Sequence, residues 1–134
     1  MPVRLPRALL SRILEHVTAS PELEVCGLLG GRAGAAVSCH PVANVADHPE
    51  RRFRMDPRGQ IDAFRVLRAA GESLYAIYHS HPQSPAEPSA TDRAEAAYPE
   101  AATLIVSLLE PGVPQVRAWR LVAGEFREVA LRVE

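Results

Sequence analysis

LYAIYHSHP, residues 74–82, is the stretch of sequence that decides the fold. Its apolar part, residues 74–78, predicts a buried strand that delivers the chain to two histidines. Because side chains alternate along a strand, His79 and His81 are expected to point to the same face of the sheet. A proline-rich loop over residues 82–88 follows and leads to Ser89.

Upstream of this strand, the patterns predict two helices and further strands. Apolar residues at helical spacing over 5–17 predict a first helix, which ends at Ser20-Pro21. A second helix is predicted from Asp56 as N-cap, with proline at the first helical position, to Gly71. Strands are predicted over 24–31 and 36–45, and a brief strand over 53–55.

Downstream, a short helix is expected to begin at Ser89 and to end at Pro99. Residues 103–109 form an apolar run of strand length, and residues 116–122 and 125–133 are expected to form a closing hairpin. Helices interspersed with strands favour an α/β fold, a mixed sheet with helices packed on its faces. No linker or repeat divides the chain, so residues 1–134 are expected to form a single domain.

Composition narrows the function classes. A chain of 134 residues can bury a core without disulfides, and its net charge of −1 argues against a dedicated nucleic-acid binder or a polybasic membrane patch. Cys26 and Cys39 are expected to be buried thiols in a reducing cytosol, with a disulfide between neighbouring strands as the alternative. No signal peptide or membrane-spanning run is found, so a cytoplasmic location is expected. The oligomeric state stays open, a homodimer included.

A metal site is predicted from His79, His81 and Asp92. Two imidazoles on one face can reach one ion, and a loop of this length can fold Asp92 back over the strand end. Such a three-ligand set leaves one position open for water, as catalytic zinc sites do. Each part also has a structural interpretation: exposed histidines are common at strand ends, and Ser89 followed by Asp92 is typical of a helix N-cap. Both interpretations can hold together.

Peptide hydrolysis at such a site also needs a general base. Glu24 leads into the apolar run over 24–31, where an acid is unusual, because acids are seldom buried without a partner. The alternative is an ordinary solvated acid at a strand end, as Glu22 beside it illustrates. Cys26 lies two residues further on and is interpreted as core packing.

These residues resemble a known family. His79-Ser80-His81, a seven-residue gap, Ser89, two residues and Asp92 is similar to the JAMM motif of the MPN+ (Mov34/MPN/PAD-1) zinc metallopeptidases. The block over 24–30 resembles the segment in which that family keeps its catalytic glutamate. The resemblance implies a three-layer α/β/α, cytidine-deaminase-like fold (the JAB1/MPN domain) with Zn²⁺ bound by the two histidines and Asp92. It also implies Glu24 as general base and Ser89 as hydrogen-bond partner of the oxyanion or of the water.

The short loops, and the stretch RFRMD over 52–56, look more like the small bacterial branch of the family. The resemblance therefore implies as substrate a ubiquitin-like sulfur-carrier protein whose C-terminal Gly-Gly precedes the scissile bond. Glycine allows the closest backbone approach to a metal, and strand addition to a sheet edge is a natural grip on such a tail.

Four other classes of protein can be compared with these residues. A non-catalytic MPN-type scaffold would lack ligands that this chain retains, and a deconjugating enzyme for ubiquitin-like protein conjugates would share all of them. A zinc deaminase would carry glutamate two residues after the histidine and a Pro-Cys-x-x-Cys pair, whereas His81 stands two residues after His79. An amidohydrolase barrel needs about 250 residues.

Overall fold

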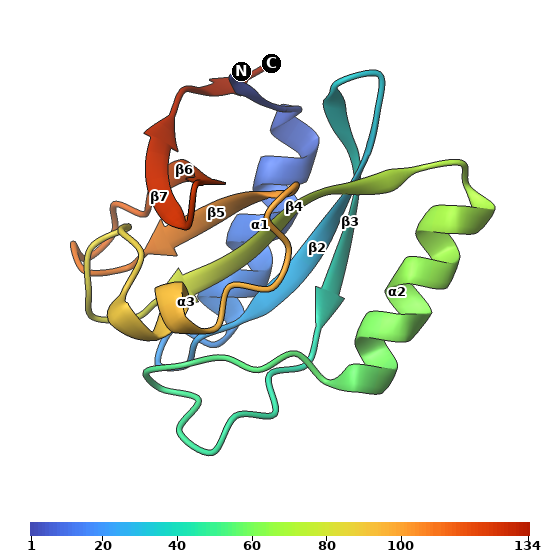
Figure 1. The fold of residues 1–134 in the computed structure, drawn as a ribbon. Coiled ribbons are helices and arrows are strands. Elements are labelled where there is room, and N and C mark those ends of the chain that lie inside the picture. The colour runs from blue at the N-terminus through green and yellow to red at the C-terminus, as the bar shows by residue number, and fades with distance from the viewer.

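A six-stranded mixed sheet forms the centre of the molecule in the computed structural model, which describes residues 1–134 (Figure 1). The strand order is β3-β2-β4-β5-β6-β7, and only β4 and β5 run parallel. The strands are β2 (Cys26–Arg32), β3 (Ala35–Val42), β4 (Ser73–His81), β5 (Ala102–Ser107), β6 (Gln115–Val122) and β7 (Glu125–Val129). The predicted mixed sheet is confirmed.

Two helices cover opposite faces of this sheet (Figure 1). The helix α1 (Arg7–Ala19) buries Leu9, Ile13 and Val17, one side chain per turn, against one face. The helix α2 (Pro57–Ala69) packs on the other face, against β3 and β4. The Asp56 carboxylate accepts a hydrogen bond from Gly59 N at 3.3 Å, as its predicted N-cap role requires. The three-layer α/β/α prediction is confirmed.

The two sides of the sheet carry separate apolar clusters. Leu29 packs with the α1 side and its neighbour Leu28 with the α2 side, because successive side chains of a strand point in opposite directions. Fifteen buried residues form the α1-side cluster, whereas only five form the α2-side cluster. Most of the apolar burial therefore lies under α1.

One glycine is needed for the packing of β4 next to the histidines. A Cβ on Gly27 would lie 2.4 Å from the Tyr78 ring, so any larger residue there would displace that ring. The Tyr78 hydroxyl lies 2.7 Å from His16 Nδ1 on α1. Gly27 thus allows Tyr78 to anchor β4 to α1, while His79 points to the opposite face.

Pairing of the two chain ends was not predicted. The strands β1 (Val3–Leu5) and β8 (Leu131–Val133) form a parallel two-stranded ribbon, and the termini lie together (Figure 1). The first helix therefore begins at Arg7 rather than at residue 5, and the predicted strand 125–133 is interrupted at Ala130. Long-range pairing between residues at opposite ends of the chain leaves no local pattern.

Two other predicted elements were wrong in detail. Residues 53–55 are not a strand; Met55 makes only an isolated bridge to Asn44. The short helix α3 (Ala90–Ala94) does not reach Pro99. Helical conformation is disfavoured at Tyr98, because a proline follows it. The Tyr98 hydroxyl instead accepts a hydrogen bond from the Gln60 side chain of α2. No helix of the chain has the length and apolar character that crossing a bilayer requires.

Candidate metal and catalytic site

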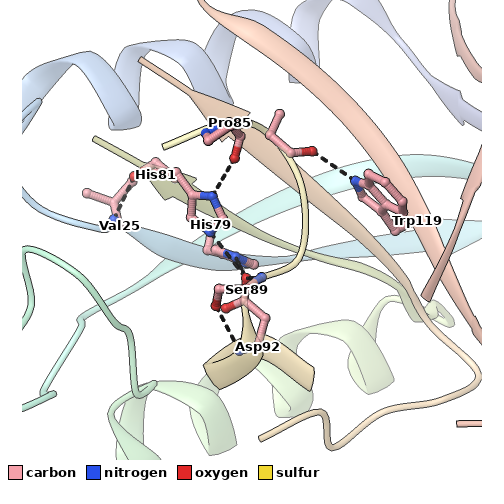
Figure 2. A network of polar contacts seen from close by, with 9 residues as sticks. Val25, His79, His81, Pro85, Ser89, Asp92 and Trp119 are labelled. Atoms are coloured by element: carbon pink, nitrogen blue, oxygen red, sulfur yellow. Dashed lines mark hydrogen bonds and ion pairs between the residues drawn. The ribbon is translucent and has the colours of Figure 1, made fainter. Parts of the chain in front are cut away.

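The two predicted histidines lie at the end of β4, on the face covered by α2. His79 and His81 are 1 % and 2 % exposed, so the sheet and its loops remove both imidazoles from solvent. Asp92 approaches them from α3, and Figure 2 shows the three side chains converging. The loop over 82–88 folds back as expected and places α3 over the strand end.

The donor atoms of these residues are spaced as ligands of one ion would be. His79 Nε2 and His81 Nε2 each lie 3.2 Å from Asp92 Oδ2. Ligand atoms at 2.0–2.1 Å on a tetrahedral zinc ion are about 3.3 Å apart. The two distances to Asp92 Oδ2 therefore match the spacing of ligands around one zinc ion.

Hydrogen bonding supports a cation between these side chains. His81 Nδ1 lies 2.7 Å from the Pro85 carbonyl oxygen, an acceptor, so this nitrogen carries the proton. In a neutral ring, Nε2 then presents a lone pair to the Asp92 carboxylate, which is repulsive unless a proton or a metal ion lies between them. The residues fit a divalent metal, and the carbonyl of Pro85 orients the ring.

The pKa values of the three groups are shifted by burial and by their mutual contacts. Burial pulls the pKa of His81 down, but its contacts with Asp92 and Pro85 outweigh burial and raise it. Burial lowers the pKa of His79, so this ring is neutral and able to act as a ligand. Burial opposes ionisation of Asp92, yet its hydrogen bonds to both histidines hold its pKa far below the ordinary value. The carboxylate is therefore ionised at neutral pH.

Ser89 and Asp92 form a capping box at the start of α3. Asp92 N donates to Ser89 Oγ at 3.0 Å, and Ser89 N donates to Asp92 Oδ2 at 2.9 Å (Figure 2). The predicted helix cap is confirmed, and the cap sets the direction in which the Asp92 carboxylate points. The Ser89 hydroxyl accepts in this box, so its proton is free to be donated into the site.

Glu24 lies two residues before β2 and is buried, with 5 % of its surface exposed. Three potential ligand atoms lie within 4.8 Å of one another, one each from Glu24, His79 and His81. Its Oε1 atom has no hydrogen-bond partner, and burial raises the pKa of this carboxyl to about 7. A carboxyl group that titrates near neutrality beside a metal-ligand set is suited to proton transfer.

Either carboxylate is near enough to the histidines to complete a ligand set. Asp92 Oδ2 is 3.2 Å from both imidazoles, whereas Glu24 is placed only within the wider 4.8 Å group. The shorter spacing favours Asp92 as ligand and leaves Glu24 beside the open position. Cys26 is not part of the set: it is fully buried, burial raises the pKa of its thiol to about 12, and its Sγ donates to the Val42 carbonyl.

Two positioning residues, Ser80 and Asn44, were missed by sequence reasoning. Ser80, on the opposite face of β4 from the histidines, exchanges hydrogen bonds with Val25: Val25 N donates to Ser80 Oγ at 2.9 Å, and Ser80 N donates to Val25 O at 3.0 Å. Asn44 Nδ2 donates to the Glu24 carbonyl at 2.8 Å. Together they hold the backbone that directly follows the Glu24 side chain. The only sequence signal was the polar Ser80 within a buried strand.

Two cavities border the cluster. The larger, of about 480 Å³, borders His79 and Asp92 and is walled by the loop over 46–55, the segment 95–98 and the β6-β7 hairpin. Phe53 stacks on His79 there, with ring centroids 4.5 Å apart. The smaller, of about 340 Å³, borders Glu24. The larger cavity thus borders two of the predicted metal ligands, whereas the smaller borders Glu24 and none of the three.

Known proteins can now be compared with this geometry. Residues 6–122 match the family of prokaryotic homologs of the JAB domain, Prok-JAB. The chain belongs to the Prok-JAB family. This confirms the resemblance to the bacterial branch of the JAMM metallopeptidases that the motif indicated.

Three relatives of this Prok-JAB chain carry names that describe an activity. A desampylase of Haloferax volcanii is 36% identical over 95% of this chain and 90% of its own. A probable TtuB-protein conjugate cleaving protease of Thermus thermophilus is 37% identical over 96% of this chain and 80% of its own. A CysO-cysteine peptidase of Mycobacterium tuberculosis is 30% identical over 93% of this chain and 86% of its own. All three are named for the removal of something from another protein.

The fold of this Prok-JAB chain also has solved counterparts. The solution structure of a protein from Desulfitobacterium hafniense superposes with a TM-score of 0.87 at 32% identity, covering 98% of this chain and 92% of that one. A JAB1/MPN domain protein of Archaeoglobus fulgidus superposes with a TM-score of 0.64 at 19% identity, covering 98% and 96%. The JAB1/MPN fold is thereby confirmed.

Proposed function

We propose that this chain is a zinc-dependent peptidase that hydrolyses the bond after the C-terminal Gly-Gly of a ubiquitin-like sulfur-carrier protein. The observation that carries the proposal is the convergence of His79 Nε2 and His81 Nε2 on Asp92 Oδ2, at 3.2 Å each, beside the buried carboxyl of Glu24. Membership of the Prok-JAB family, with relatives named as peptidases, supports the same reaction class. Residues 1–134 would act as one domain in the cytoplasm.

Zn²⁺ is the metal that this ligand set suits best. Two imidazoles and one carboxylate with an open fourth position are typical of catalytic zinc in hydrolases. A zinc ion bound there supplies Lewis acidity and lowers the pKa of water to about 7. The Pro85 carbonyl, 2.7 Å from His81 Nδ1, keeps the other nitrogen of that ring available as a ligand.

Glu24 would act as the general base and then as the general acid. It would take a proton from the attacking water and return it to the leaving amine as the C–N bond breaks. Burial supports this role, because it raises the pKa of Glu24 to about 7 and lets the group both accept and donate a proton near neutral pH. Ser80 Oγ accepts from Val25 N and Asn44 donates to the Glu24 carbonyl, and these two hydrogen bonds would hold Glu24 in place.

Ser89 would donate a hydrogen bond to the oxygen on which negative charge develops. Its Oγ already accepts from Asp92 N at 3.0 Å, which orients the hydroxyl and leaves its proton for the substrate. Removal of one such donor costs on the order of 10²–10³ in rate in enzymes where it has been tested.

The cavity of about 480 Å³ would receive the carrier's tail. Its walls are largely apolar, with Phe53, Leu121 and Phe126 among them, and it borders two of the three ligand residues. A Gly-Gly tail has no side chains to clash with Phe53 where it stacks on His79, and glycine lets the carbonyl approach closely.

The test uses sulfur-carrier proteins from the same genome, each produced with a few extra residues after Gly-Gly. Incubation with zinc-loaded protein should release the extension, which mass spectrometry detects as a carrier ending in Gly-Gly. A chelator should stop the reaction, and added zinc should restore it. Carriers left intact by the zinc-loaded protein would exclude the trimming reaction.

Metal content tests the ligand set separately. Wild-type protein should hold about one zinc per chain, and His79→Ala should lose it, because two remaining ligands bind zinc weakly. The exposed His48 gives a matched control, since His48→Ala removes an imidazole away from the cluster and should keep the zinc. Equal zinc content in all three proteins by elemental analysis would contradict the assignment.

A second candidate is the cleavage of conjugates between a ubiquitin-like protein and another protein. The name of the Thermus relative, a probable conjugate cleaving protease, favours it. The same residues would serve, and only the leaving group would differ. A non-catalytic binding role would require the zinc-loaded protein to bind carriers without cleaving any of them.

A further inference from the structure

The smaller cavity, of about 340 Å³, lies on the Glu24 side of the metal-ligand set. Its lining is polar or charged apart from one proline, in contrast to the largely apolar larger cavity: Glu22, Glu24, Glu50, Arg51, Pro82, Gln83 and Ser84. Its volume is at the lower end of the roughly 300–1,000 Å³ range of small-ligand pockets. The space therefore suits a small and charged occupant.

The buried carboxylate on its wall lacks a partner. Glu24 is 5 % exposed, and its Oε1 makes no hydrogen bond within the protein. Buried polar atoms are nearly always satisfied, so an unsatisfied one on a cavity wall points to a ligand that supplies the donor. An amine is such a donor.

Arg51 is the only basic residue that lines this cavity. Although three carboxylates border the same space, its guanidinium makes no ion pair, and its backbone N–H donates to the His48 carbonyl. An unpaired arginine presents a planar fork of donors that matches a carboxylate. The cavity thus offers acids for an amine and one arginine for a carboxylate.

We infer that this cavity holds the leaving group, and that Arg51 binds the free α-carboxylate of an amino acid attached after Gly-Gly. The inference rests on the proposed function and specifies its substrate class: carriers extended by a single free amino acid. Water adds its oxygen to the glycyl carbonyl carbon, the C–N bond breaks, and Glu24 passes the proton to the amine. The released amino acid then has its ammonium beside the acids and its carboxylate at Arg51.

A lysine isopeptide lacks this recognition element. The amine released from a conjugate belongs to a lysine side chain, whose α-carboxyl is bound in the peptide chain of the target protein. It would leave Arg51 without an anion. The cavity therefore favours trimming of a terminal amino acid over removal of a conjugated protein.

The test compares three forms of one carrier, each prepared by ligation after Gly-Gly: an added alanine with a free carboxylate, the same alanine as its amide, and an Nα-acetyl-lysine amide joined through its side chain. Wild-type protein should cleave the acid with a kcat/KM about fivefold to tenfold above that of the amide and of the isopeptide, the range expected for a partly solvated charged pair. Arg51→Gln should remove this preference and leave the cleavage of the amide unchanged. Arg58→Gln, at an exposed arginine of α2 outside both cavities, should keep the preference.

Equal cleavage of acid and amide by wild-type protein would overturn the inference while the proposed function stands. So would an Arg51→Gln protein that loses both reactions equally, since that would mean a structural role for the residue. If wild-type protein cleaves none of the three carriers, the proposed function fails, and this inference with it.

Discussion

The two faces of the sheet differ in how much apolar packing and how many buried polar residues they hold. On one face, α1 packs on the sheet through Leu9, Ile13 and Val17. These side chains belong to an apolar cluster of fifteen buried residues. The α2 face has a cluster of only five buried residues, and α2 packs mainly against β3 and β4 rather than against β5. A cavity of about 480 Å³ borders this face beside the buried His79. Most of the buried apolar residues thus lie on one face, and the other face holds the buried polar residues of the site.

Loss of the Glu24 carboxylate should give the largest effect on function. Glu24→Gln keeps the shape of the side chain but cannot accept the proton, so kcat/KM for carrier trimming should fall by about 10²–10⁴ with the zinc content unchanged. Glu15→Gln, an exposed substitution on α1 at the opposite face, should retain full activity. A Glu24→Gln protein as active as wild type would remove Glu24 from the mechanism.

A pair of matched isoleucines tests where the stability lies. Ile13 on α1 is fully buried, so Ile13→Ala should lower the free energy of unfolding by about 2–5 kcal/mol. Ile61 on α2 is 52% exposed, so Ile61→Ala should change it by less than about 0.5 kcal/mol. Chemical denaturation measures both, and equal losses would contradict the division of labour between the faces.

The site should also destabilise the metal-free protein in a pH-dependent way. Because burial raises the folded-state pKa of Glu24 from 4.5 to about 7, its protonated form favours folding below about pH 4.5, and that contribution is lost as the pH rises through about 7. The difference in free energy of unfolding between Glu24→Gln and wild type, both treated with chelator, should therefore depend on pH. From pH 4 to pH 8 it should shift in favour of the variant by on the order of 2 kcal/mol. Denaturation at the two pH values measures the difference. A difference of zero would mean that Glu24 is better solvated than its burial indicates.

Local signals made the site predictable in part. His79 and His81 were assigned to one face by strand alternation, and Asp92 was placed by the cap that Ser89 makes. The prediction that α3 reaches Pro99 was wrong, because the contact of the Tyr98 hydroxyl with Gln60 on another helix leaves no local pattern. The β1-β8 pairing was not predicted either, because it joins residues at opposite ends of the chain.

The amino-acid sequence by itself determined the ligand types, their spacing and the order of the elements, because strand alternation and helix capping act over a few residues. Only the tertiary structure decided that Glu24 meets the histidines. Their proximity depends on the antiparallel register that pairs Cys26 with His79. It also depends on the hydrogen bonds of Ser80 and Asn44 with the backbone next to Glu24. Register between strands about fifty residues apart is set by the packing of the whole sheet, and no short stretch of sequence encodes it.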